Sequence, residues 1–231
     1  MNQLSLNLVA ISVFTVTMAT LLGPLIHLSP VVPALATAGA LGLATIDTLS
    51  WQGQGATLLL DWLAGFSPAH RDRVIRHEAG HFLAAHDLGI PITGYALTAW
   101  EAFRQGQPGN GGVQFDAQEI EAAVRQGNIP ARLLDRYCTV WMAGMAAEVM
   151  AYGDFQGGAD DRQILRSLLK QLGFTPEASQ QKERWAALRA KALLRDRQDA
   201  YDALVAAMER RAAVDECLQV IGPVPSIPTA A

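Results

Sequence analysis

The first part of the chain is a continuous apolar stretch rather than an alternation of apolar and polar positions. Residues 1–46 contain no Asp, Glu, Lys or Arg, and Asp47 is the first charged side chain. As a helix, this stretch would be about 69 Å long at roughly 1.5 Å per residue, whereas one crossing of the hydrocarbon core takes about 30 Å. We therefore predict two membrane-spanning helices over residues 4–28 and 32–49, joined by a turn that contains Pro30 and Pro33.

Two other interpretations of this stretch stay open. A signal peptide could end at the small residues of Ala34-Leu35-Ala36, but no basic residue precedes the apolar core and the apolar character continues beyond it. The second segment is rich in Ala and Gly, and could instead be a helix buried in protein or only half inserted. We expect the apolar head to be retained as an anchor.

The distribution of basic residues predicts the side of the membrane. If both segments span, the N-terminus and the rest of the chain lie on the same side. Arg71, Arg73 and Arg76 follow the spans closely, and the turn between the spans has no basic residue. The positive-inside bias then places the large domain in the cytoplasm. Residues 51–66, which include Trp51 and Trp62, are predicted to form a linker at the membrane interface.

Beyond residue 66 the pattern becomes that of a helical domain. Ser67 and Pro68 favour a helix start and Gly89 favours its end, which predicts a helix over residues 67–88. Two short strands are expected, around a loop that contains Pro and Gly. These strands are placed at residues 92–100 and 112–115, and further helices at 116–125, 130–152, from 160 onward, and as one or two helices over 176–220.

The predicted fold class is therefore mainly α. A transmembrane helical hairpin (residues 1–50) and the linker precede a helical domain with a small β element (67–220) and a flexible tail (221–231). Half of the residues are hydrophobic, which excludes a disordered chain. A net charge of −4, from 18 basic and 22 acidic residues, gives no cationic field for nucleic acid. Two cysteines are too few for a disulfide scaffold and fit a reducing compartment.

One motif carries chemistry. Residues 77–81 read His-Glu-Ala-Gly-His, an HExxH motif inside the first predicted helix of the domain. Positions i and i+4 lie on one helical face, so both imidazoles can reach one Zn²⁺ ion. Glu78 could then take a proton from a water at the open position of the metal. The alternative is an amphipathic helix with two surface histidines, although the apolar residues at 74–75 and 82–83 flank the motif as in a buried helix.

A zinc site of this kind needs a third protein ligand. His86 lies five residues after His81, on the wrong face of a continuous helix. Asp87 would require a chain reversal after His81, where this chain has no Gly. The remaining candidates are Glu148 and, after the Gly-Gly turn at 157–158, Asp160 and Asp161. For the two aspartates, simple capping of a helix start is the alternative role.

Three segments taken together carry a family resemblance. The HExxH motif is followed by Gly-Met-Ala-Ala-Glu at 144–148 and by Gly-Gly-Ala-Asp-Asp at 157–161. In type, order and approximate spacing, these segments resemble the peptidase domain of the FtsH-type membrane zinc proteases, over residues 67–220. The resemblance implies that zinc is bound by His77, His81 and Asp161, that Glu78 is the general base, and that Glu148 orients a ligand imidazole by accepting its hydrogen bond.

The chain also departs from that family. Met145 stands where the family usually has Arg, Asp160 stands in place of Asn, and the loop at 101–112 is expanded. No GxxxxGK[ST] phosphate loop occurs in these residues, so the ATPase module of the family is missing. The chain resembles instead the stand-alone, membrane-anchored relatives known from photosynthetic organisms, which implies a plasma or thylakoid membrane.

The resulting expectation is a membrane-anchored zinc endopeptidase that cuts unfolded or membrane-associated proteins without an ATPase of its own. The expected partners are protein or peptide substrates, the membrane, a separate ATPase or FtsH-type protease, and further copies in a homo-oligomer, which the resemblance makes a hexamer. The alternative is a non-catalytic zinc-binding or regulatory subunit that assembles with ATP-dependent FtsH-type proteases. The presence of Glu78 favours activity. A helical protein with an accidental motif is the third interpretation.

Overall fold

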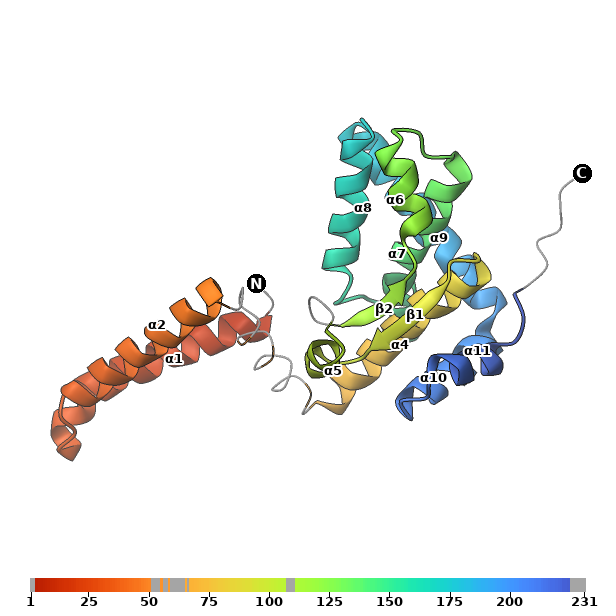
Figure 1. The fold of residues 1–231 in the computed structure, drawn as a ribbon. Helices are drawn as coiled ribbons and strands as arrows, with labels where there is room; N and C mark the ends of the chain where they lie inside the picture. The colour runs from red at the N-terminus through yellow and green to blue at the C-terminus, as the bar shows by residue number, and fades with distance from the viewer. Residues whose placement is uncertain are drawn as a thin grey trace, which may run out of the picture. The chain divides into compact units, whose positions relative to one another are not determined.

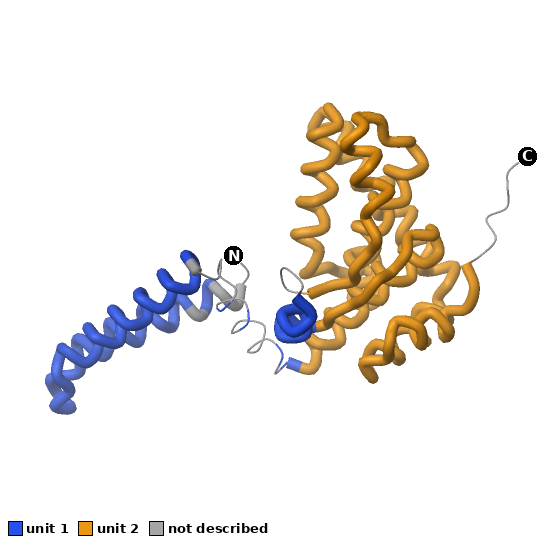
Figure 2. Tube along the Cα trace, in the orientation of Figure 1, with its two compact units in different colours: residues 1–67, 98–110 blue, residues 68–97, 111–231 orange. Residues whose placement is uncertain are grey.

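The structure, a computed structural model, describes residues 3–50, 55, 58, 65, 67–106 and 111–224. The predicted linker and tail therefore lie largely outside the described residues. The chain divides into two compact units (Figure 2). Residues 1–67 and 98–110 form the first, here called the hairpin unit, and residues 68–97 and 111–231 form the second, the helical unit.

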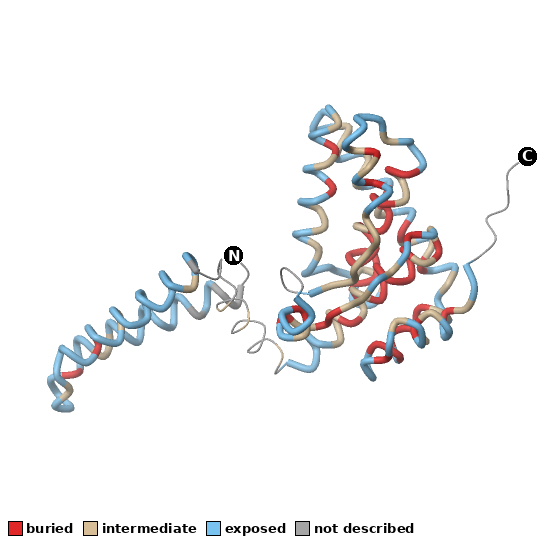
Figure 3. The backbone as a smooth tube through the Cα atoms, in the orientation of Figure 1, coloured by how far each residue is buried: buried red, intermediate tan, exposed pale blue. Residues whose placement is uncertain are grey.

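Two apolar helices lie side by side in the hairpin unit (Figure 1). Helix α1 spans Gln3–Leu22 and helix α2 spans Val31–Ser50, with a 3₁₀ turn at Gly23–Ile26 between them. Their apolar side chains are mostly exposed (Figure 3), and both helices are long and apolar enough to cross a membrane. The first helix ends before the predicted residue 28, because Pro24 has no N–H to continue the helical hydrogen bonds.

One expected strand is shorter than predicted. Strand β1 covers Ile92–Ala96, whereas the sequence suggested that it reaches Trp100. The residues that follow form the short helix α5, Ala99–Arg104, within the hairpin unit. The reason is an N-cap: the hydroxyl of Thr98 accepts a hydrogen bond from the backbone N–H of Glu101 at 3.0 Å, which starts a helix at this point.

The helical unit is organised around α7, Ala131–Tyr152, which packs against both α4, Pro68–Asp87, and α9, Pro176–Asp196. Strand β1 pairs antiparallel with β2, Gly112–Phe115, and both strands contact α4. The other helices of this unit are α6 (Gln118–Arg125), α8 (Ala159–Gln171), α10 (Gln198–Glu209) and α11 (Val214–Ile221). A mainly helical fold with a small two-stranded sheet is thus confirmed.

The core of the helical unit fixes the helix that carries the HExxH motif. Phe82 and Leu83 of α4 are fully buried, as are Val140 of α7, Leu194 of α9 and Leu204 of α10. Fully buried aliphatic and aromatic side chains each contribute about 1.5–3 kcal/mol relative to exposure. The motif therefore lies on a rigid, buried helix, as its flanking apolar residues indicated.

The C-terminal part of the unit differs from the prediction of one or two helices over residues 176–220. Three helices are present there, with breaks at Arg197 and at residues 210–213. At the second break Arg211 adopts a left-handed backbone conformation, φ 60°. Neither break contains a Gly or Pro that would predict it from the sequence. At the first break, the guanidinium of Arg197 donates a hydrogen bond to the carbonyl of Ile221 in α11. A contact with α11 thus accompanies the first break, whereas local backbone hydrogen bonds among residues 207–212 close the helix at the second.

Candidate metal centre

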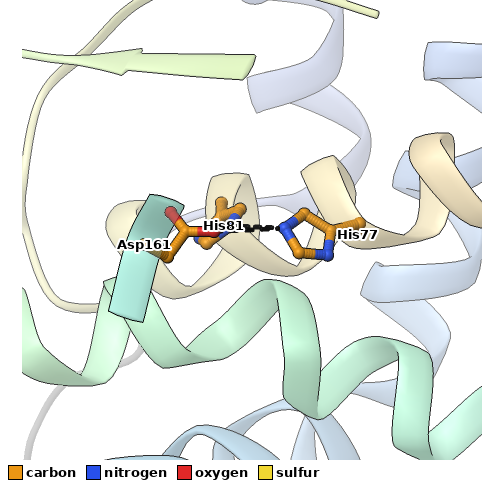
Figure 4. A group of neighbouring side chains, drawn as sticks. All are labelled: His77, His81 and Asp161. Atoms are coloured by element: carbon orange, nitrogen blue, oxygen red, sulfur yellow. Dashed lines mark hydrogen bonds and ion pairs between the residues drawn. The ribbon is translucent and has the colours of Figure 1, made fainter. Parts of the chain in front are cut away.

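Three side chains from two helices converge on one point (Figure 4). His77 and His81 lie one turn apart on α4, and their Nε2 atoms are 3.0 Å from each other. Asp161, in the first turn of α8, places its Oδ2 atom 3.4 Å from both of these nitrogens. The three ligand atoms all lie within 4.8 Å of one another, so this group could hold a metal ion.

Helix α7 orients both imidazoles. The Nδ1 atom of His81 donates to the backbone carbonyl of Val140 at 2.8 Å, and Nδ1 of His77 lies 2.7 Å from Oε1 of Glu148. Because Nδ1 is the donor in each ring, Nε2 is the atom left to offer a lone pair. The two Nε2 lone pairs therefore point toward the same place.

Glu148 connects the histidines to the segment that carries Asp161. Its buried carboxylate accepts hydrogen bonds from the backbone N–H groups of Gln156 and Gly157, at 2.8 and 3.1 Å, and from the Arg73 guanidinium at 2.9 Å. Burial opposes its ionisation, but the hydrogen bonds from His77 and Arg73 lower the pKa of Glu148 to about 2. A permanently charged carboxylate thus holds one ligand and the loop before α8.

Arg73 is a contributor that the sequence analysis missed in this role. It lies four residues before His77, on the same face of α4, and also donates to Asp154 at 3.0 Å. The four-residue spacing could have predicted this role from the sequence, because a guanidinium one helical turn before a histidine can reach the carboxylate that binds the histidine.

A left-handed glycine directs Asp161 toward the histidines. Gly158 is the N-cap of α8 with φ +79°, a conformation that side chains rarely adopt. No side chain caps this helix, so capping by an aspartate, the alternative role considered above, does not occur. Asp161 is turned inward and 23% of its side chain is exposed, whereas Asp160 is exposed to solvent.

Close packing of α4 against α7 leaves room for the ligands and little else. A Cβ atom on Gly144 would lie 2.4 Å from Nε2 of His77 and 2.5 Å from Nε2 of His81. A Cβ on Gly80 would lie 2.7 Å from the carbonyl oxygen of Ala143. The small residues of the second motif therefore serve two purposes: they let the helices approach, and at Gly144 they leave the ligand nitrogens free.

The charges in the group are balanced when a proton or a metal ion lies between the ligand atoms. Burial disfavours a charged ring, but hydrogen bonds to Asp161 and Glu148 raise the pKa of His77 to about 10. Despite its own burial, Asp161 has a pKa well below the usual range, because His81 and His77 stabilise its charge. Two lone pairs and a carboxylate converging in a buried space repel one another unless a proton or a metal ion lies between them. This donor set therefore fits a metal ion.

Glu78 lies next to His77 on α4 and is held by the sheet. The backbone N–H of Val113, in β2, donates to its Oε2 atom at 3.0 Å. The negative charge of Glu78 contributes to the raised pKa of both histidines. This contact with β2 had no signal in the sequence, because a backbone donor leaves no trace in residue identity.

The other candidate ligands lie elsewhere. Asp87 is near the opposite end of α4, where its Oδ1 is 3.0 Å from Nδ1 of His86 and 3.3 Å from the Arg197 guanidinium. That pairing accounts for the buried charge of Asp87. The structure thus brings together His77, His81 and Asp161, with Glu78 and Glu148 beside them, and leaves out His86, Asp87 and Asp160.

Neither a scan against protein-family models nor a search of curated proteins gave a match to this chain.

We expect Asp161→Asn to weaken metal binding by at least about tenfold, the lower end of the cost that even outer hydrogen-bond partners carry. Asp160→Asn is the matched control, since it makes the same change one residue away on an exposed side chain. Titration of the metal-free variants with Zn²⁺ against a competing indicator measures both. Weaker binding in Asp160→Asn than in Asp161→Asn would contradict this assignment.

Gly144→Ala should abolish metal binding while leaving α7 helical, because the added methyl group meets both ligand nitrogens. Gly42→Ala is the control, a helical glycine with no atom within 4 Å of the position that its Cβ would take. Metal content after purification, with circular dichroism to confirm folding, distinguishes the two. Full metal content in Gly144→Ala would show that the ligands are held differently.

The stability of the metal-free protein should be highest between about pH 4.5 and 6.5 and should fall as the pH rises toward 10. The pKa of His77 is raised from 6.5 to about 10, so its contribution is complete below pH 6.5 and is lost as the pH rises through 10. The pKa of Glu148 is lowered from 4.5 to about 2, so its contribution is lost only as the pH falls below 4.5.

The melting temperature of chelator-treated protein across this pH range provides the measurement. Adding metal should remove the loss above pH 6.5, because metal replaces the proton. A melting temperature of the metal-free protein that rises between pH 6.5 and 10 would contradict the prediction.

Proposed function

We propose that this protein is a membrane-anchored zinc metalloendopeptidase that cleaves unfolded or membrane-associated polypeptides. The observation that carries the proposal is the convergence of His77, His81 and Asp161 with Glu78 beside them. Two imidazole nitrogens and one carboxylate oxygen are a ligand set typical of catalytic zinc, with a coordination position left for the reaction. The resemblance of the three motif segments to FtsH-type peptidases points the same way.

Each residue of the site has a separate role in the proposed reaction. Zinc, when bound by His77, His81 and Asp161, supplies Lewis acidity toward water and the scissile carbonyl. Glu78 accepts the proton of the attacking water and delivers it to the leaving amine. Val113 keeps the Glu78 carboxylate in one orientation through its backbone N–H. Glu148 holds the His77 ring and, with Arg73, remains ionised, so it does not compete for the transferred proton.

Anchoring to a membrane completes the proposal. Helices α1 and α2 expose apolar side chains over two stretches of suitable length, Val9–Ile26 and Val31–Leu49. The positive-inside bias supports a peptidase on the cytoplasmic side of a plasma or thylakoid membrane. Delivery of substrate by a separate ATPase, and assembly into a homo-oligomer or with an FtsH-type protease, remain parts of the proposal that the family resemblance supports.

Glu78→Gln should keep zinc and lower the rate of peptide cleavage by about 10²- to 10⁴-fold, the usual contribution of a general base. His77→Ala or His81→Ala should remove zinc and activity together. The assay uses the full chain in detergent, an unfolded fluorophore-labelled protein as substrate, and metal analysis of each variant. Asp160→Asn serves as the active control.

Two results would count against the proposal. A Glu78→Gln variant with wild-type activity would show that another group takes the proton. The second result is a wild-type protein that binds one equivalent of zinc but cleaves no unfolded substrate alone, and adds no cleavage to that of an FtsH-type protease. That result would favour the non-catalytic subunit instead.

A further inference from the structure

The hairpin unit carries an exposed aromatic pair outside its two apolar helices. Trp100 and Phe103 of α5 are 57% and 52% exposed, and their rings stack with centroids 5.8 Å apart. They are three positions apart and share one face of α5, whereas Ala99 and Ala102 are buried. Two adjacent aromatic side chains in water expose apolar area at a cost, and covering this area would be favourable.

We propose that this aromatic pair inserts into the interfacial layer of the lipid bilayer in which the hairpin is anchored. Tryptophan favours the level of the lipid headgroups, because its ring is apolar and its N–H remains hydrated. Arg104, exposed in the last turn of α5, can extend its guanidinium toward headgroup phosphates from the same short helix.

The bilayer is the occupant favoured by the organisation of the chain. Residues 98–110 belong to the same compact unit as α1 and α2 (Figure 2). The 17 residues between Ser50 and Pro68, which precede α5 in sequence, can span at most about 60 Å when extended, so the chain that follows stays within that distance of the end of α2. A bilayer that holds the hairpin is therefore the apolar surface to which this helix is tethered.

A second exposed tryptophan has charged neighbours instead of an aromatic one. Trp185 of α9 is 40% exposed, and the cations of Lys182 and Arg189 lie 4.9 and 5.3 Å from its ring. Such cation–π contacts suit a ring at an aqueous surface. Trp100 instead stacks on a second apolar ring, which enlarges the apolar patch.

The position of α5 in the chain links this contact to the candidate active site. The helix lies on the connection between β1 and β2, and β2 supplies the N–H that holds Glu78. A membrane-bound α5 keeps this connection at the bilayer surface and so favours, as substrates, polypeptide segments that emerge from the membrane. This consequence rests on the proposed peptidase function, whereas the membrane contact itself rests only on the proposed anchoring of the hairpin.

Spin labelling of the full chain in lipid vesicles tests the contact. Cys138 and Cys217 are fully buried, and burial raises the pKa of both thiols, so they react poorly with a labelling reagent. Single nitroxides are placed with Trp100→Cys, Phe103→Cys and, as control, Leu188→Cys, at a 70% exposed position on α9. Collisions with oxygen, which partitions into lipid, are compared with collisions with a water-soluble nickel chelate.

The labels at 100 and 103 should collide more with oxygen and less with the chelate than the label at 188. The same aqueous profile at all three positions would overturn the proposal. Spin–spin broadening at 100 that disappears on dilution with unlabelled protein, without lipid exposure, would assign the patch to a contact between copies and would also overturn it. Because the measurement needs neither metal nor cleavage, its failure is separate from failure of the peptidase proposal.

Native fluorescence provides a second measurement that keeps the aromatic character of the patch. Brominated lipids should quench part of the emission of the wild-type protein, which has five tryptophans. In Trp100→Phe, the quenched part should be smaller, while the Phe103 contact and the fold are kept. An unchanged quenched fraction in Trp100→Phe would place Trp100 outside the bilayer and overturn the proposal.

Discussion

The candidate centre depends on the hydrogen bonds that the buried carboxylate of Glu148 accepts. This carboxylate holds the ring of His77, accepts two backbone N–H groups of the loop before α8, and pairs with Arg73. A charge buried at this depth is tolerated only because every one of these partners is present. Side chains from two helices that are far apart in sequence are thereby held next to one another, which is the condition for a site of defined geometry.

The second constraint on the site is the close approach of two helix backbones. Helices α4 and α7 approach so closely that glycine is required at 80 and 144, and the ligand nitrogens occupy the space that a side chain at 144 would fill. The same packing brings the carbonyl of Val140 to His81 and selects its tautomer. Small residues, which contribute little apolar area themselves, thus determine where the lone pairs of the two histidines point.

The two units hold the apolar helices and the candidate centre, respectively, and they interleave in sequence. The connection between β1 and β2 leaves the helical unit, forms α5 within the hairpin unit and returns to the strand that contacts Glu78.

The sequence by itself determined the features that arise from local periodicity and backbone preference. These are the apolar hairpin, the helix that carries His77 and His81 one turn apart, and the glycine turn before Asp161. Family resemblance named Asp161 and Glu148, but the residues alone left the third ligand open among several acids. Only the tertiary structure separated Asp161 from Glu148 and Asp160: Asp161 faces both Nε2 atoms, Glu148 faces the Nδ1 atom of one ring, and Asp160 is exposed to solvent.

Tertiary structure likewise decided the Arg73 contact with Glu148 and the backbone donor to Glu78. These depend on which surfaces pack together, and packing across the chain leaves no pattern in neighbouring residues.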